Sequence, residues 1–225
     1  MIPHGVVRAR TLLSDQAAKS DAPQWCLAEL CGRLCELVTG SAAIDAGSSA
    51  LLTAAAQLMA DAQRMGEPVA WICAASALFF PPDLQSNGID LQSVTIVRVT
   101  DAQAAAQAAD QLLRSGCFGL VVIDLSAVEA TIGDAVLGRL GGLARTHRAA
   151  VLFLCNLEAI TTSAAAATVG GNCSELGSIV SLRAHARSRA LTTGRFLVEI
   201  EVSKDKRRGI AWRWTETCDG PPGLS

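Results

Sequence analysis

The segment Leu34-Cys-Glu-Leu-Val-Thr-Gly-Ser-Ala-Ala-Ile-Asp-Ala-Gly-Ser-Ser49 decides the fold of this chain. Its first six residues predict a strand over 34–39. The alanine-rich stretch that follows predicts a long helix over about 48–65 with one buried face. Gly66 is placed to end that helix as a C-cap glycine. The segment therefore reads as strand, glycine-bounded loop and helix, the first half of a βαβ unit.

The same alternation continues downstream. Apolar runs predict strands over 69–73, 94–99, 120–124 and 149–155. Helices are predicted from Thr100 or Asp101, either of which can cap, to Arg114, and over about 134–147. Nearly continuous apolar strands such as 120–124 are typical of a parallel sheet that is buried on both faces. Alternation of this kind favours βαβ units around one such sheet.

The pattern changes after Asn156. Residues 158–173 form a low-complexity stretch rich in Ala, Thr and Gly, and three strand-like segments follow at 179–185, 196–202 and 210–214. Their alternation predicts antiparallel strands with one solvated face. We therefore expect an α/β fold with a mostly parallel central sheet flanked by helices and an antiparallel extension at the C-terminal end. We expect a lead segment over residues 1–24, with a weak helix at 7–19. One core domain is expected over 25–218, followed by a tail over 219–225.

Composition narrows the classes of function. Half of the 225 residues are hydrophobic, and the net charge of -2 argues against a protein that coats nucleic acid over its whole surface. The longest apolar stretch, 69–80, is too short to cross a membrane. No secretory signal precedes the eight cysteines, so we expect free thiols in a reducing cytoplasm. Cys26, Cys31 and Cys35 lack the paired spacing and the nearby His of a zinc site, so no metal is expected.

The loop of the opening segment has the outline of a phosphate-binding P-loop. A working P-loop surrounds phosphates with backbone N–H groups and adds a Lys for the phosphates and a Ser or Thr for Mg²⁺. Here Ser48 stands in the place of the Lys, no lysine occurs between Lys19 and Lys204, and the spacing is two residues too long. A degenerate nucleotide site would comprise Gly40, Gly47, Ser48, Ser49 and Asp124. A structural turn, weak nucleotide binding and hydrolysis all stay open, and the missing lysine favours the turn.

The order of these motifs resembles the RecA-like recombinase core. Gly32-Arg-Leu-Cys-Glu-Leu-Val-Thr-Gly40 is similar to the strand that enters that family's P-loop, and Leu120-Val-Val-Ile-Asp124 is similar to its Walker B strand. Three further segments occur in the same order as in the family: Gly66-Glu-Pro-Val-Ala-Trp-Ile-Cys-Ala-Ala-Ser-Ala-Leu78, Asn87-Gly-Ile-Asp-Leu91 and Leu113-Arg-Ser-Gly116. Together the resemblance covers about 32–202.

The resemblance implies where catalytic residues would stand. RecA-like ATPases activate water with a Glu at the end of the second strand, where this chain has Ala75. A γ-phosphate-sensing Gln is replaced by Leu157, or by Asn156 if the register shifts by one. Asp124 remains, either for a metal or as the polar end of a buried strand. Two loops bind DNA in that family. The interval that corresponds to the first, 126–133, is too short here, and the interval that corresponds to the second, 158–173, contains no Arg, Lys or aromatic residue. We therefore expect no enzyme activity and no cofactor, with ATP and Mg²⁺ as the alternative.

Within that group the chain resembles the ImuA type, which is also similar to SulA. The resemblance rests on Ser76-Ala-Leu-Phe-Phe-Pro-Pro-Asp83 and Val202-Ser-Lys-Asp-Lys-Arg207. It implies an accessory role in the SOS response and translesion mutagenesis, through contacts with RecA or with translesion polymerase components. A divergent weak ATPase or DNA-binding RecA paralogue and a SulA-like cell-division regulator are the alternatives. A monomer or small oligomer is expected.

Basic residues gather late in the chain. The span 183–213 holds nine Lys or Arg and three acidic residues, and 204–208 reads as a hairpin tip. Such a cluster contacts phosphates or an acidic partner, or is simply a solvated turn. Trp212 and Trp214 are expected to face the core. The candidates for contact with a partner or DNA are Arg183, Arg187, Lys204, Lys206, Arg207 and Arg208.

Overall fold

The computed structural model describes residues 22–39, 47–75, 77, 84–85, 88–128, 131–156, 176–192, 194–209 and 211–219, with backbone only at 47–49. Its elements in chain order are α2 (Leu27–Leu30), β1 (Leu34–Thr39), α3 (Gly47–Arg64), β2 (Val69–Ala74), η1 (Leu91–Ser93), β3 (Val94–Val99), α5 (Ala102–Ser115), β4 (Leu120–Asp124), α6 (Asp134–His147), β5 (Ala150–Cys155), β6 (Leu182–Thr192), β7 (Arg195–Asp205) and β8 (Trp212–Asp219).

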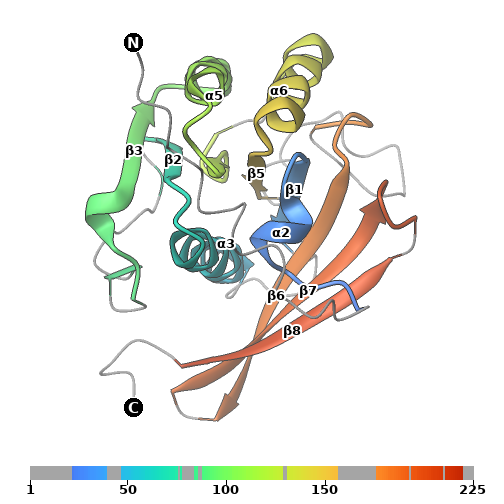
Figure 1. Ribbon diagram of the computed structural model, residues 1–225. Helices are drawn as coiled ribbons and strands as arrows, with labels where there is room; N and C mark the ends of the chain where they lie inside the picture. Colours follow the sequence, from blue (N-terminus) through green and yellow to red (C-terminus); the bar gives the residue numbers. More distant parts are fainter. Residues whose placement is uncertain are drawn as a thin grey trace.

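One mixed sheet organises the described residues (Figure 1). Its strand order is β3-β2-β4-β5-β1-β6-β7-β8. The strands from β3 to β6 pair in parallel, whereas β7 is antiparallel to both β6 and β8. The expected α/β fold, a mostly parallel sheet with antiparallel strands at the C-terminal end, is confirmed. The first of the three segments predicted to be antiparallel differs, because β6 pairs in parallel with β1 and is antiparallel only to β7.

Helices cover both faces of the parallel part because its inner strands are apolar at nearly every position. β1, β2, β4 and β5 are buried along their whole length. Alternate residues of each strand point to opposite faces. Cys35 and Leu37 therefore join the core under α2 and α3, and Leu34 and Val38 join the core under α5 and α6. Figure 1 shows these two helix pairs on opposite sides of the sheet.

Local signals in the sequence set the helix ends. Of the two expected caps for α5, Asp101 is the one used, because its Oδ1 accepts a hydrogen bond from the Ala104 amide at 2.8 Å. Gly116 ends α5 in the left-handed conformation at φ 66°, which residues with a side chain rarely adopt. None of the helices in the part of the chain described here is long and apolar enough to span a bilayer.

The three C-terminal strands are longer than the sequence predicts, and their boundaries are shifted. β6 starts at Leu182 rather than at residue 179, and β7 extends to Asp205. The pairing continues past residue 202 because a bulge lets Arg183 pair with Lys204 while Ala184 pairs with Val202. The predicted helix at 7–19, the low-complexity stretch 158–173 and the tail beyond 219 lie outside the described residues.

Two buried ion pairs join the β1 region to β6 and β7. Arg33, just before β1, pairs with Asp205 at the end of β7 over 2.5 Å, and both side chains are almost fully buried. Glu36 in β1 lies beside Arg183 in β6 and accepts its Nε–H at 2.6 Å. Both pairs are enclosed by protein, so they fix the register between β1 and the strands that follow it.

Candidate functional site

The carboxyl edge of the parallel strands is where a nucleotide site would lie. Ligands of open α/β sheets bind outside the carboxyl ends of the strands. Register brings the candidate positions to this edge, because Cys73 of β2 lies beside Asp124 of β4, and Val38 of β1 lies beside Cys155 of β5. The residues that follow these strands, Ala75 and Asn156, therefore share one edge with Asp124.

Asp124 is bound within its own turn. It is 2% exposed, and its Oδ1 accepts hydrogen bonds from the Ser126 amide at 3.0 Å and the Ser126 hydroxyl at 2.6 Å. Burial raises the pKa of Asp124 above its ordinary value, against the opposing effect of these two hydrogen bonds. This geometry is that of the polar end of a buried strand. Among the described residues, no group of three His, Cys, Asp or Glu side chains is placed to hold a metal ion.

The other two catalytic positions carry no acid or base. Ala75 is exposed directly after β2, where its methyl group offers no proton acceptor. Asn156 follows β5, and its Oδ1 accepts a hydrogen bond from the Thr39 hydroxyl at 3.2 Å. This bond links the ends of β1 and β5. Leu157, the other candidate for the γ-phosphate-sensing position, lies outside the described residues.

The helix that would follow a P-loop starts where the sequence predicts. The backbone of α3 begins at Gly47, directly before Ser48 and Ser49. Gly40 and the loop up to residue 46 lie outside the described residues, as do the side chains of Ser48 and Ser49. The role of these residues in binding a nucleotide therefore stays a prediction.

One cation lies at this edge that the sequence did not single out. Arg98 of β3 lies beside Cys73, and its guanidinium donates to the Ala74 carbonyl at 3.3 Å. Burial raises the pKa of the Cys73 thiol, while the charge of Arg98 opposes that rise. The sequence offers no motif around Arg98; its place depends on the register between β2 and β3.

Arg183 is not a surface residue, which corrects its assignment as a contact for a partner or DNA. Its guanidinium is enclosed between Glu36 and the Gly177 carbonyl, to which it donates at 2.8 Å. The Leu176 amide also donates to Glu36, at 3.4 Å. The sequence around Arg183 gives no sign of this burial, because the partner of Arg183 lies 147 positions away in β1.

Lys204 at the end of β7 and three basic residues of the turn that follows it contact α2 and the segment before β6. Lys204 and Lys206 both donate to the Ser178 carbonyl, at 3.0 and 2.6 Å. Arg207 donates to the carbonyls of Glu29 and Cys31, at 3.1 and 2.9 Å, and Arg208 pairs with the Glu29 carboxylate. These contacts join the end of β7 and the turn after it to α2 and to the segment before β6. Contact of these residues with a partner or DNA stays a prediction.

The remaining candidates of this segment divide between surface and core. Arg187 is exposed on β6, opposite Glu199 of β7. Trp212 and Trp214 pack against the core under α3, and the Trp212 indole N–H donates to Asp205 at 3.0 Å. The expected core-facing tryptophan pair is therefore confirmed.

The fold and this edge define a class: a mixed α/β protein whose mostly parallel sheet is compatible with a RecA-like core. No protein-family model matches the chain. It is 36% identical over 99 residues to protein RecA of Nocardioides sp. (strain ATCC BAA-499 / JS614), which covers 40% of this chain and 28% of that RecA.

Other RecA proteins give similar matches. Protein RecA of Thermotoga maritima is 35% identical over 98 residues, 40% of this chain and 27% of its own length. Protein RecA of Mycobacterium leprae is 30% identical over 135 residues, 49% of this chain and 19% of its own length. The chain thus spans less than a third of the RecA relatives that it matches. These similarities support a RecA-like relationship.

Proposed function

We propose that this chain is a non-catalytic, RecA-like accessory protein that acts through protein contacts in DNA-damage tolerance. The observation that carries the proposal is the carboxyl edge of the sheet. Ala75 offers no base there, and Asp124 is buried and held by Ser126. No lysine between residues 19 and 204 is available to bind phosphates. A RecA-like core without these groups is suited to binding other proteins and not to hydrolysing ATP.

RecA itself or translesion polymerase components are the partners we propose. Support comes from the similarity to RecA proteins and from the two sequence phrases that resemble the ImuA type, residues 76–83 and 202–207. The exposed Arg187 and the Lys206–Arg208 turn offer positive charge for an acidic partner. DNA is the other ligand that such charges suit, and its phosphates would compete for the same side chains.

A divergent, weak ATPase is the second candidate function. The observation that favours it is the position of Asp124, at the carboxyl end of β4 and beside β2, the strand position of a Walker B aspartate in the RecA-like resemblance. A helix starting at Gly47 also places amide groups where phosphates would bind. This candidate requires measurable nucleotide binding.

Capture by the immobilised full chain tests the partner role. We expect retention of RecA or of translesion polymerase components without added ATP. Arg187→Glu should weaken this retention several-fold, because charges at the rim of an interface act mainly on association. Arg114→Glu is the matched control, since Arg114 lies on α5 and pairs with Asp110. Retention of the cell-division GTPase alone would favour the SulA-like alternative, and retention of none of these proteins would contradict the proposal.

A further inference from the structure

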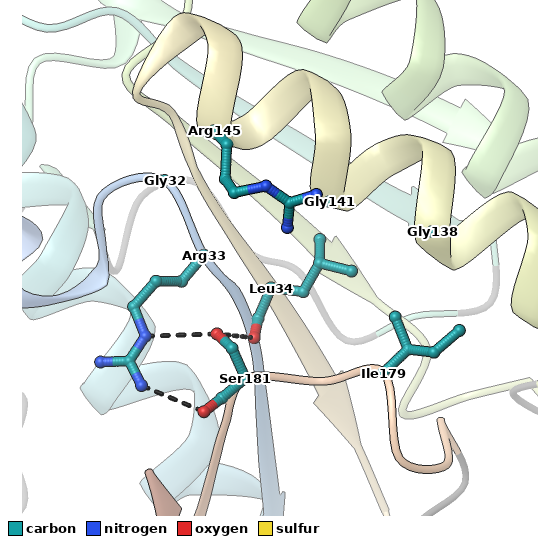
Figure 2. Close-up of a pocket in the computed structure, with 8 residues that line it drawn as sticks. All are labelled: Gly32, Arg33, Leu34, Gly138, Gly141, Arg145, Ile179 and Ser181. Atoms are coloured by element: carbon teal, nitrogen blue, oxygen red, sulfur yellow. Dashed lines mark hydrogen bonds between the residues drawn. The ribbon is translucent and has the colours of Figure 1, made fainter. Parts of the chain in front are cut away.

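A groove opens at the amino-terminal edge of the sheet, opposite the edge of the candidate nucleotide site. Figure 2 shows it between the start of β1, the helix α6 and the segment that leads into β6. Its volume is about 200 Å³. Pockets for drug-sized ligands measure about 300–1,000 Å³. The groove is therefore sized for one or two side chains and not for a nucleotide.

Glycines on α6 keep the groove open. A Cβ atom added at Gly138 would meet nothing within 4 Å, and one added at Gly141 would lie 3.4 Å from the Leu34 side chain. Leu34 and Ile179 supply apolar lining. At Gly138 and Gly141 the wall formed by α6 is thus bare backbone, and it faces aliphatic groups from β1 and from the segment before β6. Such a surface accepts an aliphatic side chain.

Two of the polar groups in the groove are already bound within the protein. The Arg33 Nε–H donates to the Ser181 hydroxyl at 3.2 Å, and that hydroxyl donates to the Leu34 carbonyl at 3.0 Å. The charge of Arg33 is balanced by Asp205. These groups, drawn with dashed lines in Figure 2, shape the groove without leaving it a net charge.

Arg145 differs from them. It is exposed on α6, and its guanidinium reaches back over the groove, with Nη1 3.6 Å from the position of a Cβ at Gly141 (Figure 2). Within the part of the chain that the structure describes, its guanidinium has no hydrogen-bond or ion-pair partner, and no residue lining the groove is acidic. The groove therefore combines an apolar bottom with one uncompensated positive charge.

We propose that this groove binds a short peptide segment of a partner protein, in which an aliphatic side chain is flanked by a carboxylate. The aliphatic group would lie against Gly138, Leu34 and Ile179, and the carboxylate would pair with the guanidinium of Arg145, a geometry that favours two parallel hydrogen bonds. The groove and the candidate nucleotide site lie at opposite edges of the sheet, so this inference holds whether or not the chain binds nucleotide.

A random dodecapeptide library displayed on phage tests the proposal with the full chain as bait. Gly138→Leu fills the groove and raises the helix propensity of α6, so that a loss of binding does not arise from unfolding. Gly142→Leu is the matched control. It lies on the same helix, also has open space for a side chain, and does not line the groove.

We expect enrichment of peptides with Leu, Ile or Val next to Asp or Glu on the wild type and on Gly142→Leu, and no enrichment on Gly138→Leu. A selected peptide should bind Arg145→Glu at least about tenfold more weakly, by fluorescence anisotropy. The proposal is overturned if no such peptides are enriched, or if Gly138→Leu retains them. Self-association of the wild type that Gly138→Leu abolishes would identify a second copy as the occupant and would equally overturn it.

Discussion

Asp205→Ala is expected to lower the free energy of unfolding by about 3–5 kcal/mol, because it leaves the buried charge of Arg33 without its partner. Asp205 also accepts hydrogen bonds from the Trp212 indole at 3.0 Å and from the Arg207 amide at 2.9 Å. One carboxylate thus joins the start of β1 to the turn after β7 and to β8. Urea denaturation followed by circular dichroism measures the loss.

The double variant Arg33→Met with Asp205→Leu is the control for this prediction. It removes both buried charges, and apolar replacements of a buried pair are often neutral or stabilising. We therefore expect the double variant to be more stable than Asp205→Ala, although the Trp212 indole and the Arg207 amide lose their acceptor in both. If Asp205→Ala costs less than about 1 kcal/mol, the pair is not the buried junction described here.

The pH dependence has a defined sign. Burial alone would raise the pKa of Asp205, but hydrogen bonds from Arg33, Trp212 and the backbone amides of Arg207 and Arg208 together lower it to about 2. A lowered pKa in the folded state means that the stabilisation is complete above the ordinary aspartate pKa of about 3.9 and is lost as the pH falls toward 2. The difference in stability between wild type and Asp205→Ala should shrink over that range.

The second large effect is expected for Arg183→Ala. It leaves the Glu36 carboxylate buried in the sheet without its counter-charge, and we expect a loss of about 3–5 kcal/mol in the free energy of unfolding. Arg187→Ala is the matched control two residues along the same strand, since exposed substitutions usually change stability by less than about 0.5 kcal/mol. If both variants change the stability by equal, small amounts, Arg183 is a surface residue, as the sequence suggested, and the buried pair with Glu36 is contradicted.

The parallel part of the fold was predictable because its strands are buried on both faces. A run such as Leu120–Asp124 must be apolar throughout, so its periodicity and its bounds are visible in the sequence. The helix ends were equally visible, because Asp101 and Gly116 each satisfy a local requirement of the backbone. The bounds of β6 to β8 were not, because they depend on a bulge and on pairing between strands.

The candidate site was predictable in its motifs but not in its contacts. The order of strands placed Asp124 and Ala75 at one edge, as the sequence indicated. The burial of Arg183, by contrast, depends on its register beside Glu36, and the position of Arg98 depends on its register beside Cys73. Register between distant strands leaves no local signature, so a basic residue in the sequence does not reveal whether it faces water or a buried carboxylate.

Calorimetric titration of the full chain with ATP and Mg²⁺ tests the central claim most directly, with thermal unfolding as a second readout. A ligand at about 100 times its Kd adds about 2.7 kcal/mol to stability, which is easily detected. The account predicts no binding heat and no shift in the unfolding temperature at millimolar ATP. Saturable binding with hydrolysis that Asp124→Asn abolishes would contradict it, and would make this chain a working ATPase.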